Sequence, residues 1–142
     1  FSRARSCVEE TVTMKIYEAL INNEEIMKLV TKNNIKFFDY PNAQEIKDIV
    51  IVIDPLDTPK PDDFADNDNL TYEYLYQIDV FVKQNQGVNG RVLSDRLVFL
   101  IQRIMWEVLG FGETSSIKPE YIKEFSIYRQ AKRFEGKQYF KI

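Results

Sequence analysis

The chain has 142 residues, a formal net charge of −3, 44% apolar and 29% charged residues, which together indicate one folded domain with a real core. It has no histidine and one cysteine, which excludes histidine as a general base or metal ligand and excludes an intrachain disulfide. The longest apolar run, Ile49–Ile53, falls far short of the roughly 20 residues of a membrane-spanning helix, and the acidic balance gives no overall basic surface for nucleic acid.

Residues 1–13 differ from the rest of the chain, because they have neither an amphipathic period nor the apolar centre of a secretory signal. A helical pattern starts directly after Met14, and the pair Glu9-Glu10 precedes it. Glutamate codons are purine-rich, so this pair fits a translated ribosome-binding site. Two interpretations stay open: translation naturally starts at Met14, or residues 1–13 form a flexible N-terminal arm. Residues 14–142 are expected to form a single domain.

The first half of that domain predicts two helices and two strands. Apolar residues at helical spacing indicate a helix that ends near Asn23 and a short second helix over Glu24–Val30, with Asn23 as its cap. A short strand is expected at Ile35–Asp39. The run Ile49–Ile53 is apolar and β-branched throughout, which predicts a strand buried on both faces.

An acidic segment follows at residues 54–70, where proline, aspartate and asparagine dominate. This composition predicts a long loop without regular structure, and loops of such length are typically functional or mobile. Its carboxylates suggest calcium, but the segment lacks the central glycine and terminal glutamate of a helix-flanked calcium loop. We therefore expect a solvated acidic loop and no metal.

The organising element is a long strand predicted at Thr71–Lys83, where apolar and polar residues alternate. Tyrosines and β-branched residues line one face, which is typical of a buried sheet surface. The strand is long enough to be the central member of an antiparallel sheet. Leu75 and Phe81 interrupt the polar face, and each is covered either by a segment of this chain or by another subunit of an assembly.

The sequence over Arg91–Leu109 predicts the clearest helix, with an apolar face for packing on the sheet and Gly110 just past its end. Trp106 is expected at the edge of the core. Residues 111–119 are expected to be a connector.

A strand is predicted from residue 121 to 133. A tight turn follows at residues 134–137, where Gly136 would supply a positive φ, and a last strand is predicted at 137–142.

The predicted fold class is α+β, with an antiparallel or mixed sheet of about four to five strands packed against two main helices. No nucleophile–base pair, phosphate-binding glycine loop or metal-ligand cluster is present in the sequence. We expect no catalytic residue, no metal and no cofactor, and hence a protein that is not an enzyme.

Basic residues gather around the predicted last turn, opposite in charge to the acidic segment. Three interpretations stay open for this cluster: a solvated hairpin tip, contact with a phosphate backbone, or contact with the acidic segment of a neighbouring copy. An acidic and a basic surface on one chain are what a head-to-tail contact requires, and such contacts close into rings when the rotation permits. The candidate subunit or tube interface residues are Asp57, Asp62, Asp63, Asp66, Asp68, Leu75, Phe81, Arg129, Lys132, Arg133 and Lys137.

From about Met14 to Ile142 the order and texture of the segments resemble the tail terminator (head–tail joining, tail completion) proteins of long-tailed bacteriophages and prophages. The stretches that carry the resemblance are MKIYEALINNEEIMKLV at the start, YEYLYQIDVFVK in the central strand, RLVFLIQRIMWEVLGF in the long helix and YRQAKRFEG near the end. None of them is a strict signature. Related head-closure and tail-completion proteins share small α+β subunits, so they stay as alternatives, together with a small soluble binding or regulatory domain.

The resemblance implies a structural subunit that forms a homohexameric ring on the last ring of the tail tube, stops tube growth and joins the tail to the head. The implied partners are further copies of the chain, the major tail tube protein and a head-completion or connector protein. DNA would pass through the channel without sequence-specific binding, and no membrane would be involved. The implied place is the tail–neck junction of the virion, after assembly in the cytoplasm of the bacterial host.

Overall fold

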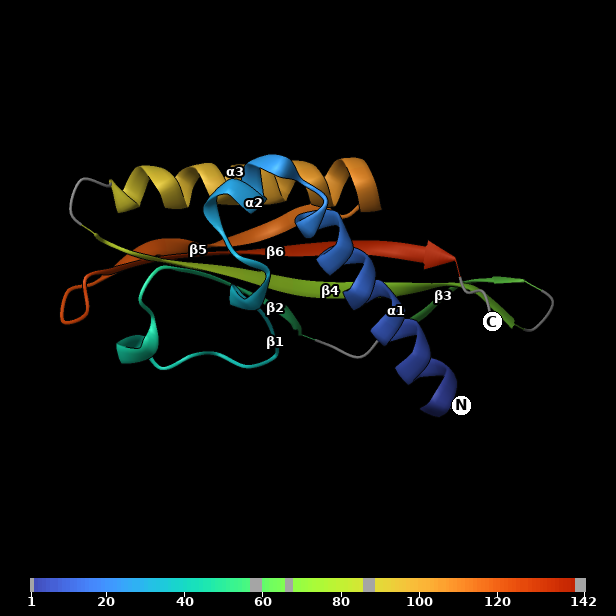
Figure 1. Cartoon of the computed structure of the whole chain (residues 1–142). Coiled ribbons are helices and arrows are strands. Elements are labelled where there is room, and N and C mark those ends of the chain that lie inside the picture. Colours follow the sequence, from blue (N-terminus) through green and yellow to red (C-terminus); the bar gives the residue numbers. More distant parts are fainter. Residues whose placement is uncertain (1, 57–59, 66–67, 86–88, 140–142) are drawn as a thin grey trace.

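The computed structural model describes residues 2–56, 60–65, 68–85 and 89–139, with side chains at 12–56, 72–85 and 89–137. These residues form an α+β structure in which one mixed sheet carries the three α-helices on one face (Figure 1). The predicted fold class is confirmed.

Three α-helices are described, α1 (Ser2–Ile21), α2 (Glu24–Leu29) and α3 (Gly90–Leu109). Six strands are described, β1 (Ile35–Phe37), β2 (Ile49–Pro55), β3 (Lys60–Ala65), β4 (Asp68–Lys83), β5 (Gly112–Ile122) and β6 (Ile127–Tyr139). The sheet order is β1-β2-β4-β6-β5, with β3 paired to β4 beyond the end of β2. β1 runs parallel to β2, and the other described pairs are antiparallel.

Asparagine and glycine set the helix ends, and the sequence predicts two of these residues, Asn23 and Gly110. The side chain of Asn23 accepts a hydrogen bond from the Ile26 amide at 3.1 Å and starts α2. Asn89 does the same for α3 through the Val92 amide at 3.2 Å. Gly110, at φ 71°, ends α3 in the left-handed conformation that glycine adopts without cost.

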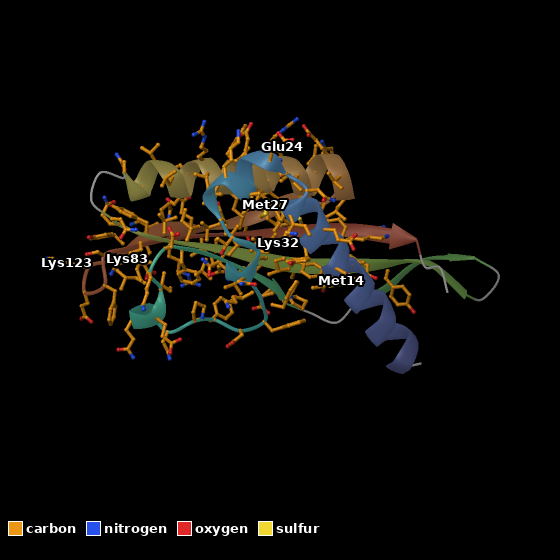
Figure 2. The ribbon with its side chains drawn as sticks, in the orientation of Figure 1. Met14, Glu24, Met27, Lys32, Lys83 and Lys123 are labelled. Carbon is orange, nitrogen blue, oxygen red and sulfur yellow. The ribbon has the colours of Figure 1, made fainter. Side chains whose placement is uncertain are left out.

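β4 is the central strand, as predicted, and it is longer than the helix layer above it. Its 16 residues span roughly 50 Å as a strand, whereas the 20 residues of α3 span about 30 Å as a helix. The part of β4 that extends beyond the helices pairs with β3 as a hairpin. We call this hairpin, residues Lys60–Ala65 and Asp68–Glu73, the arm. Figure 1 shows the arm extending past the end of α3, and Figure 2 places Lys83 and Lys123 at the opposite end of the molecule.

The expectation of a loop without regular structure at residues 54–70 is wrong. β2 continues to Pro55, and β3 pairs with β4 in the register Lys60↔Glu73 to Ala65↔Asp68. β3 has β4 as its described partner, so Pro61 lies on an edge strand, which is where proline occurs in sheets. Proline argues against a central strand and does not argue against an edge strand.

The expected connector at 111–119 and the expected turn at 134–137 are also wrong. Residues 112–122 form the edge strand β5, and its register with β6 shifts beside Ser115 and beside Pro119. Residues 134–137 lie inside β6, which is continuous there. The β5–β6 turn lies at 123–126 instead, and Ser126, at φ 55°, takes its left-handed position.

The proposed boundary at Met14 falls inside α1, which is continuous from Ser2 to Ile21. Val12 and Thr13, on its N-terminal side, are buried in the core. A hydrogen bond of 2.7 Å joins the Thr13 and Tyr76 hydroxyls, so residues 12 and 13 pack as part of the domain.

Gly136 is explained by packing rather than by a turn. The chain leaving α3 inserts Phe111 into the core on the helix face of the sheet, where its ring is fully buried and lies 6.2 Å from Tyr74 and 6.3 Å from Tyr76, centroid to centroid. A Cβ atom at Gly136 would lie 2.3 Å from Phe111 Cδ1. The Phe111 ring therefore packs directly on the backbone of Gly136. A larger residue at position 136 would require the Phe111 ring or the strand to shift.

Gly136→Ala should lower the free energy of unfolding by about 1–3 kcal/mol, because the added methyl overpacks the aromatic cluster. Urea denaturation followed by circular dichroism measures this loss. Gly112→Ala is the matched control, since its Cβ would meet its nearest neighbour, Trp106 Cζ3, at 3.9 Å. Equal effects of the two substitutions would contradict the packing explanation.

Candidate functional site

The face of β4 that points away from the helices is buried at its centre. The sequence predicts a polar, wet face here, and this prediction is wrong: Gln77 is 6% exposed, Asp79 0% and Phe81 7%. Residues 38–48 and the β5–β6 turn cross this face and cover it. Phe81 is thus enclosed by its own chain, which is the first of the two alternatives that the sequence left open.

A second, smaller apolar cluster forms under these covering segments. Its buried members come from β2, β4, β6 and the segment before β2, and they are Ile46, Val50, Val52, Phe81 and Ile127. Ala43 and Phe125 pack against them from the covering segments, and Ile122 does so from the end of β5. This cluster explains why β2 is buried on both faces, as its sequence predicts.

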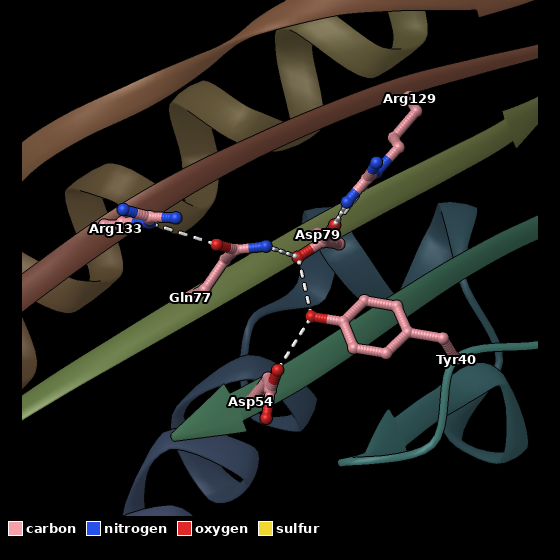
Figure 3. Close-up of polar contacts among 6 residues, drawn as sticks. All are labelled: Tyr40, Asp54, Gln77, Asp79, Arg129 and Arg133. Carbon is pink, nitrogen blue, oxygen red and sulfur yellow. Dashed lines mark hydrogen bonds and ion pairs between the residues drawn. The ribbon is translucent and has the colours of Figure 1, made fainter. Parts of the chain in front are cut away.

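Beside that cluster lies a polar network centred on Asp79 (Figure 3). Asp79 Oδ2 accepts hydrogen bonds from Arg129 Nε at 3.0 Å and Nη2 at 2.7 Å, and Oδ1 accepts one from Gln77 Nε2 at 2.8 Å. The other end of the Gln77 amide accepts a hydrogen bond from Arg133 Nε at 3.1 Å. The guanidinium of Arg129 also lies over the Phe81 ring, 5.6 Å from its centroid.

A fully buried carboxylate is costly unless it is paired and hydrogen-bonded. Asp79 meets both conditions through Arg129 and Gln77, which lie on neighbouring strand positions of the same face. The network therefore joins β4 to β6 at the middle of the sheet.

Tyr40 extends the network to the covering segment. Its hydroxyl lies 2.9 Å from Asp54 Oδ2 and 3.3 Å from Asp79 Oδ1, and its single proton can serve either carboxylate. Burial, the hydrogen bond to Asp54 and the negative charges of Asp79 and Asp54 raise the pKa of Tyr40 well above its ordinary value. Tyr40 thus remains a neutral donor that fastens segment 38–48 to β2 and β4.

The arrangement is suited to holding segments together. Both carboxylate oxygens of Asp79 accept hydrogen bonds, from Arg129, Gln77 and Tyr40. In the described part of the chain no group of three or more histidine, cysteine, aspartate or glutamate side chains is placed to hold a metal.

The predicted basic cluster is distributed along β6 and does not form a hairpin tip. Arg129, Arg133 and Lys137 alternate with uncharged or acidic positions on the helix-free face, and the first two belong to the Asp79 network. Lys132 points to the other face and pairs with Glu113 of β5. Much of this positive charge is therefore engaged within the chain.

The acidic and apolar candidates are placed as follows. Asp62 and Asp63 lie in β3 and Asp68 starts β4, all within the arm. Asp57 and Asp66 lie outside the described residues. Leu75 is half-buried, on the same face of β4 as Phe81.

The structure shows one surface feature that the sequence reasoning missed. Val92, Phe99 and Trp106, seven residues apart along α3, are 58%, 59% and 59% exposed on the side opposite the core. Arg96 and Arg103 are exposed between them. We call these five residues the α3 stripe. The seven-residue spacing was the available signal, but the stronger inward face of the helix masked it.

No protein-family model matches this chain, and a search of curated proteins found no relative. Among the described helices, none is both long enough and apolar enough to cross a membrane.

Asp79→Ala should lower the free energy of unfolding by about 3 kcal/mol, because it leaves Arg129 and Gln77 without their buried partner. Chemical denaturation measures the loss. Glu107→Ala, which breaks the exposed Arg103–Glu107 pair, should cost less than about 1 kcal/mol. A loss at Asp79 no larger than at Glu107 would mean that the ion pair does not hold the sheet.

The raised pKa of Tyr40 predicts a loss of stability in alkali. In the unfolded chain Tyr40 loses its proton near pH 10, whereas the folded chain retains it above that pH. Ionisation thus favours the unfolded state, and the contribution of Tyr40 is present below pH 10 and declines above it. Between about pH 9.5 and 11.5 the free energy of unfolding should fall more steeply for the wild type than for Tyr40→Phe. Identical slopes would refute the assignment.

Proposed function

We propose that this chain is a structural subunit of the neck of a long-tailed bacteriophage or prophage. In this proposal it acts as a tail terminator: copies form a hexameric ring on the last ring of the tail tube, stop its polymerisation and offer a docking surface to the head.

The observation that carries the proposal is the arm. It extends the sheet beyond the helix layer, so it adds less to its own core than the rest of β4 does, and it lies at an end of the molecule where another protein could contact it. Edge strands of this kind pair or pack with other chains unless they are protected. A ring subunit requires such a reaching element on one side and a receiving surface on the other.

The element order gives further support. A helix, a short strand, an apolar strand, a long central strand, an amphipathic helix and a last strand pair follow one another as in the family that the sequence resembles. The acidic segment fits this order as an extended hairpin, in place of the loop first expected.

The proposed partners follow from that role. They are other copies of this chain, the major tail tube protein below the ring and a head-completion or connector protein above it. DNA would pass through the channel without sequence-specific contact. The ring would lie at the tail–neck junction of the virion after assembly in the bacterial cytoplasm.

The role is mechanical and needs no chemical step. A ring that caps a tube depends on rigid subunits, and the Asp79 network supplies rigidity by joining β2, β4, β6 and segment 38–48. We therefore propose a structural protein and not an enzyme.

The test is electron microscopy of lysates from a phage or induced prophage that lacks this gene. A tail terminator predicts overlong tail tubes without heads, beside heads filled with DNA. Complementation with the intact gene should restore joined tails of normal length.

Tails of normal length with emptied or unjoined heads would replace the proposal with a head-closure or tail-completion role. Normal virions would overturn the neck proposal and favour a small soluble binding or regulatory domain.

A further inference from the structure

The geometry points to a head-to-tail contact between copies, in which the acidic arm of one copy packs on the α3 stripe of the next. This inference rests on the proposed function, because it names the surfaces by which ring subunits would meet. The two surfaces lie on different parts of the molecule. The arm extends beyond the end of α3 (Figure 1), whereas the stripe consists of exposed side chains of α3 itself.

The α3 stripe has the composition of a protein-binding surface. Tryptophan and arginine are the residues most enriched at the energetic centres of interfaces, and large apolar side chains are unfavourable in water. Val92, Phe99 and Trp106 are each more than half exposed, although the same helix buries a complete second face. Core packing does not explain the stripe.

The charge of the stripe selects an acidic partner. Arg96 and Arg103 lie on the same flank of α3, one turn from Val92 and Phe99 respectively. Arg103 pairs with Glu107, whereas Arg96 has no ion-pair partner among the residues with described side chains. Burial of Arg96 in an interface would require a carboxylate opposite it.

Antiparallel self-pairing of α3 would not supply that carboxylate. Arg96 comes three residues before Phe99 and Arg103 comes four residues after it. A two-fold axis at Phe99 would therefore place Arg96 of one copy near Arg103 of the other, and like charges would repel. The stripe is better matched by a different surface of the second copy, which is a heterologous contact.

The arm is an acidic segment of this chain. Its residues, KPDDFA in β3 and DNLTYE at the start of β4, contain three aspartates, one glutamate and one lysine. The basic residues of β6 are less suitable as its acceptor, because Arg129 and Arg133 are held by Asp79 and Gln77. The α3 stripe therefore replaces the β6 cluster as the basic side of the contact.

Trp106 makes the contact measurable without a label, because it is the single tryptophan of the chain and lies in the stripe. In the purified full-length protein, raising the concentration should shift tryptophan emission to the blue as sedimentation shows larger species. Arg96→Glu with Arg103→Glu should abolish both changes, and so should Asp62→Lys with Asp63→Lys. The four substitutions together should restore both.

Lys28→Glu with Lys32→Glu is the control, since it makes the same charge change at exposed positions outside α3 and the arm and should leave association unchanged. Circular dichroism confirms that each variant is folded.

Three results would overturn the inference. Larger species without a blue shift would place the contact elsewhere and leave the ring proposal standing. A shift that survives the Asp62 and Asp63 changes would mean that the stripe binds a surface other than the arm. A wild-type chain that stays monomeric at its solubility limit would exclude this contact, while the gene-deletion phenotype would still decide the neck role.

Discussion

The structure depends on a charge buried where the sheet has no helix to cover it. Asp79 lies in the C-terminal half of β4, the longest of the described strands, and its carboxylate is stable there because Arg129, Gln77 and Tyr40 surround it. These partners come from three separate parts of the chain. The residues that stabilise the buried charge of Asp79 therefore also hold those parts of the chain together on this face of the sheet. An apolar residue at position 79 would bury as much surface but would not specify which segment crosses the sheet.

The sequence predicted the elements whose pattern is local. Alternation identified β4, apolar content identified β2, and asparagine and glycine marked the ends of α2 and α3. The prediction errors arose where the conformation of a residue depends on contacts with residues far away in the sequence. Gly136 suggested a turn but leaves room for Phe111. Pro61 suggested a loop but lies on an edge strand.

The candidate site was harder to predict for the same reason. Its charged members were visible in the sequence, but Asp79 was assigned to solvent, because an alternating strand gives no sign that residues about 40 positions earlier will cover its polar face. The stripe on α3 was hidden by the stronger inward face of that helix. Both features depend on which surfaces remain after the domain has folded, and a pattern within one element does not carry that information.

The pairing of β4 with β6 has a consequence for biosynthesis. α3 and β5 lie between these two strands in the chain, so the ladder that contains Asp79 and Arg129 cannot close until residue 139 has been made. Until then a nascent chain carries a long aromatic strand with an open edge and an unpaired acidic group in its middle. Non-local strand pairing of this kind is slow and leaves intermediates prone to aggregation. β6 is made after both of the strands that it pairs with, β4 and β5, so the solubility of the nascent chain depends on its arrival.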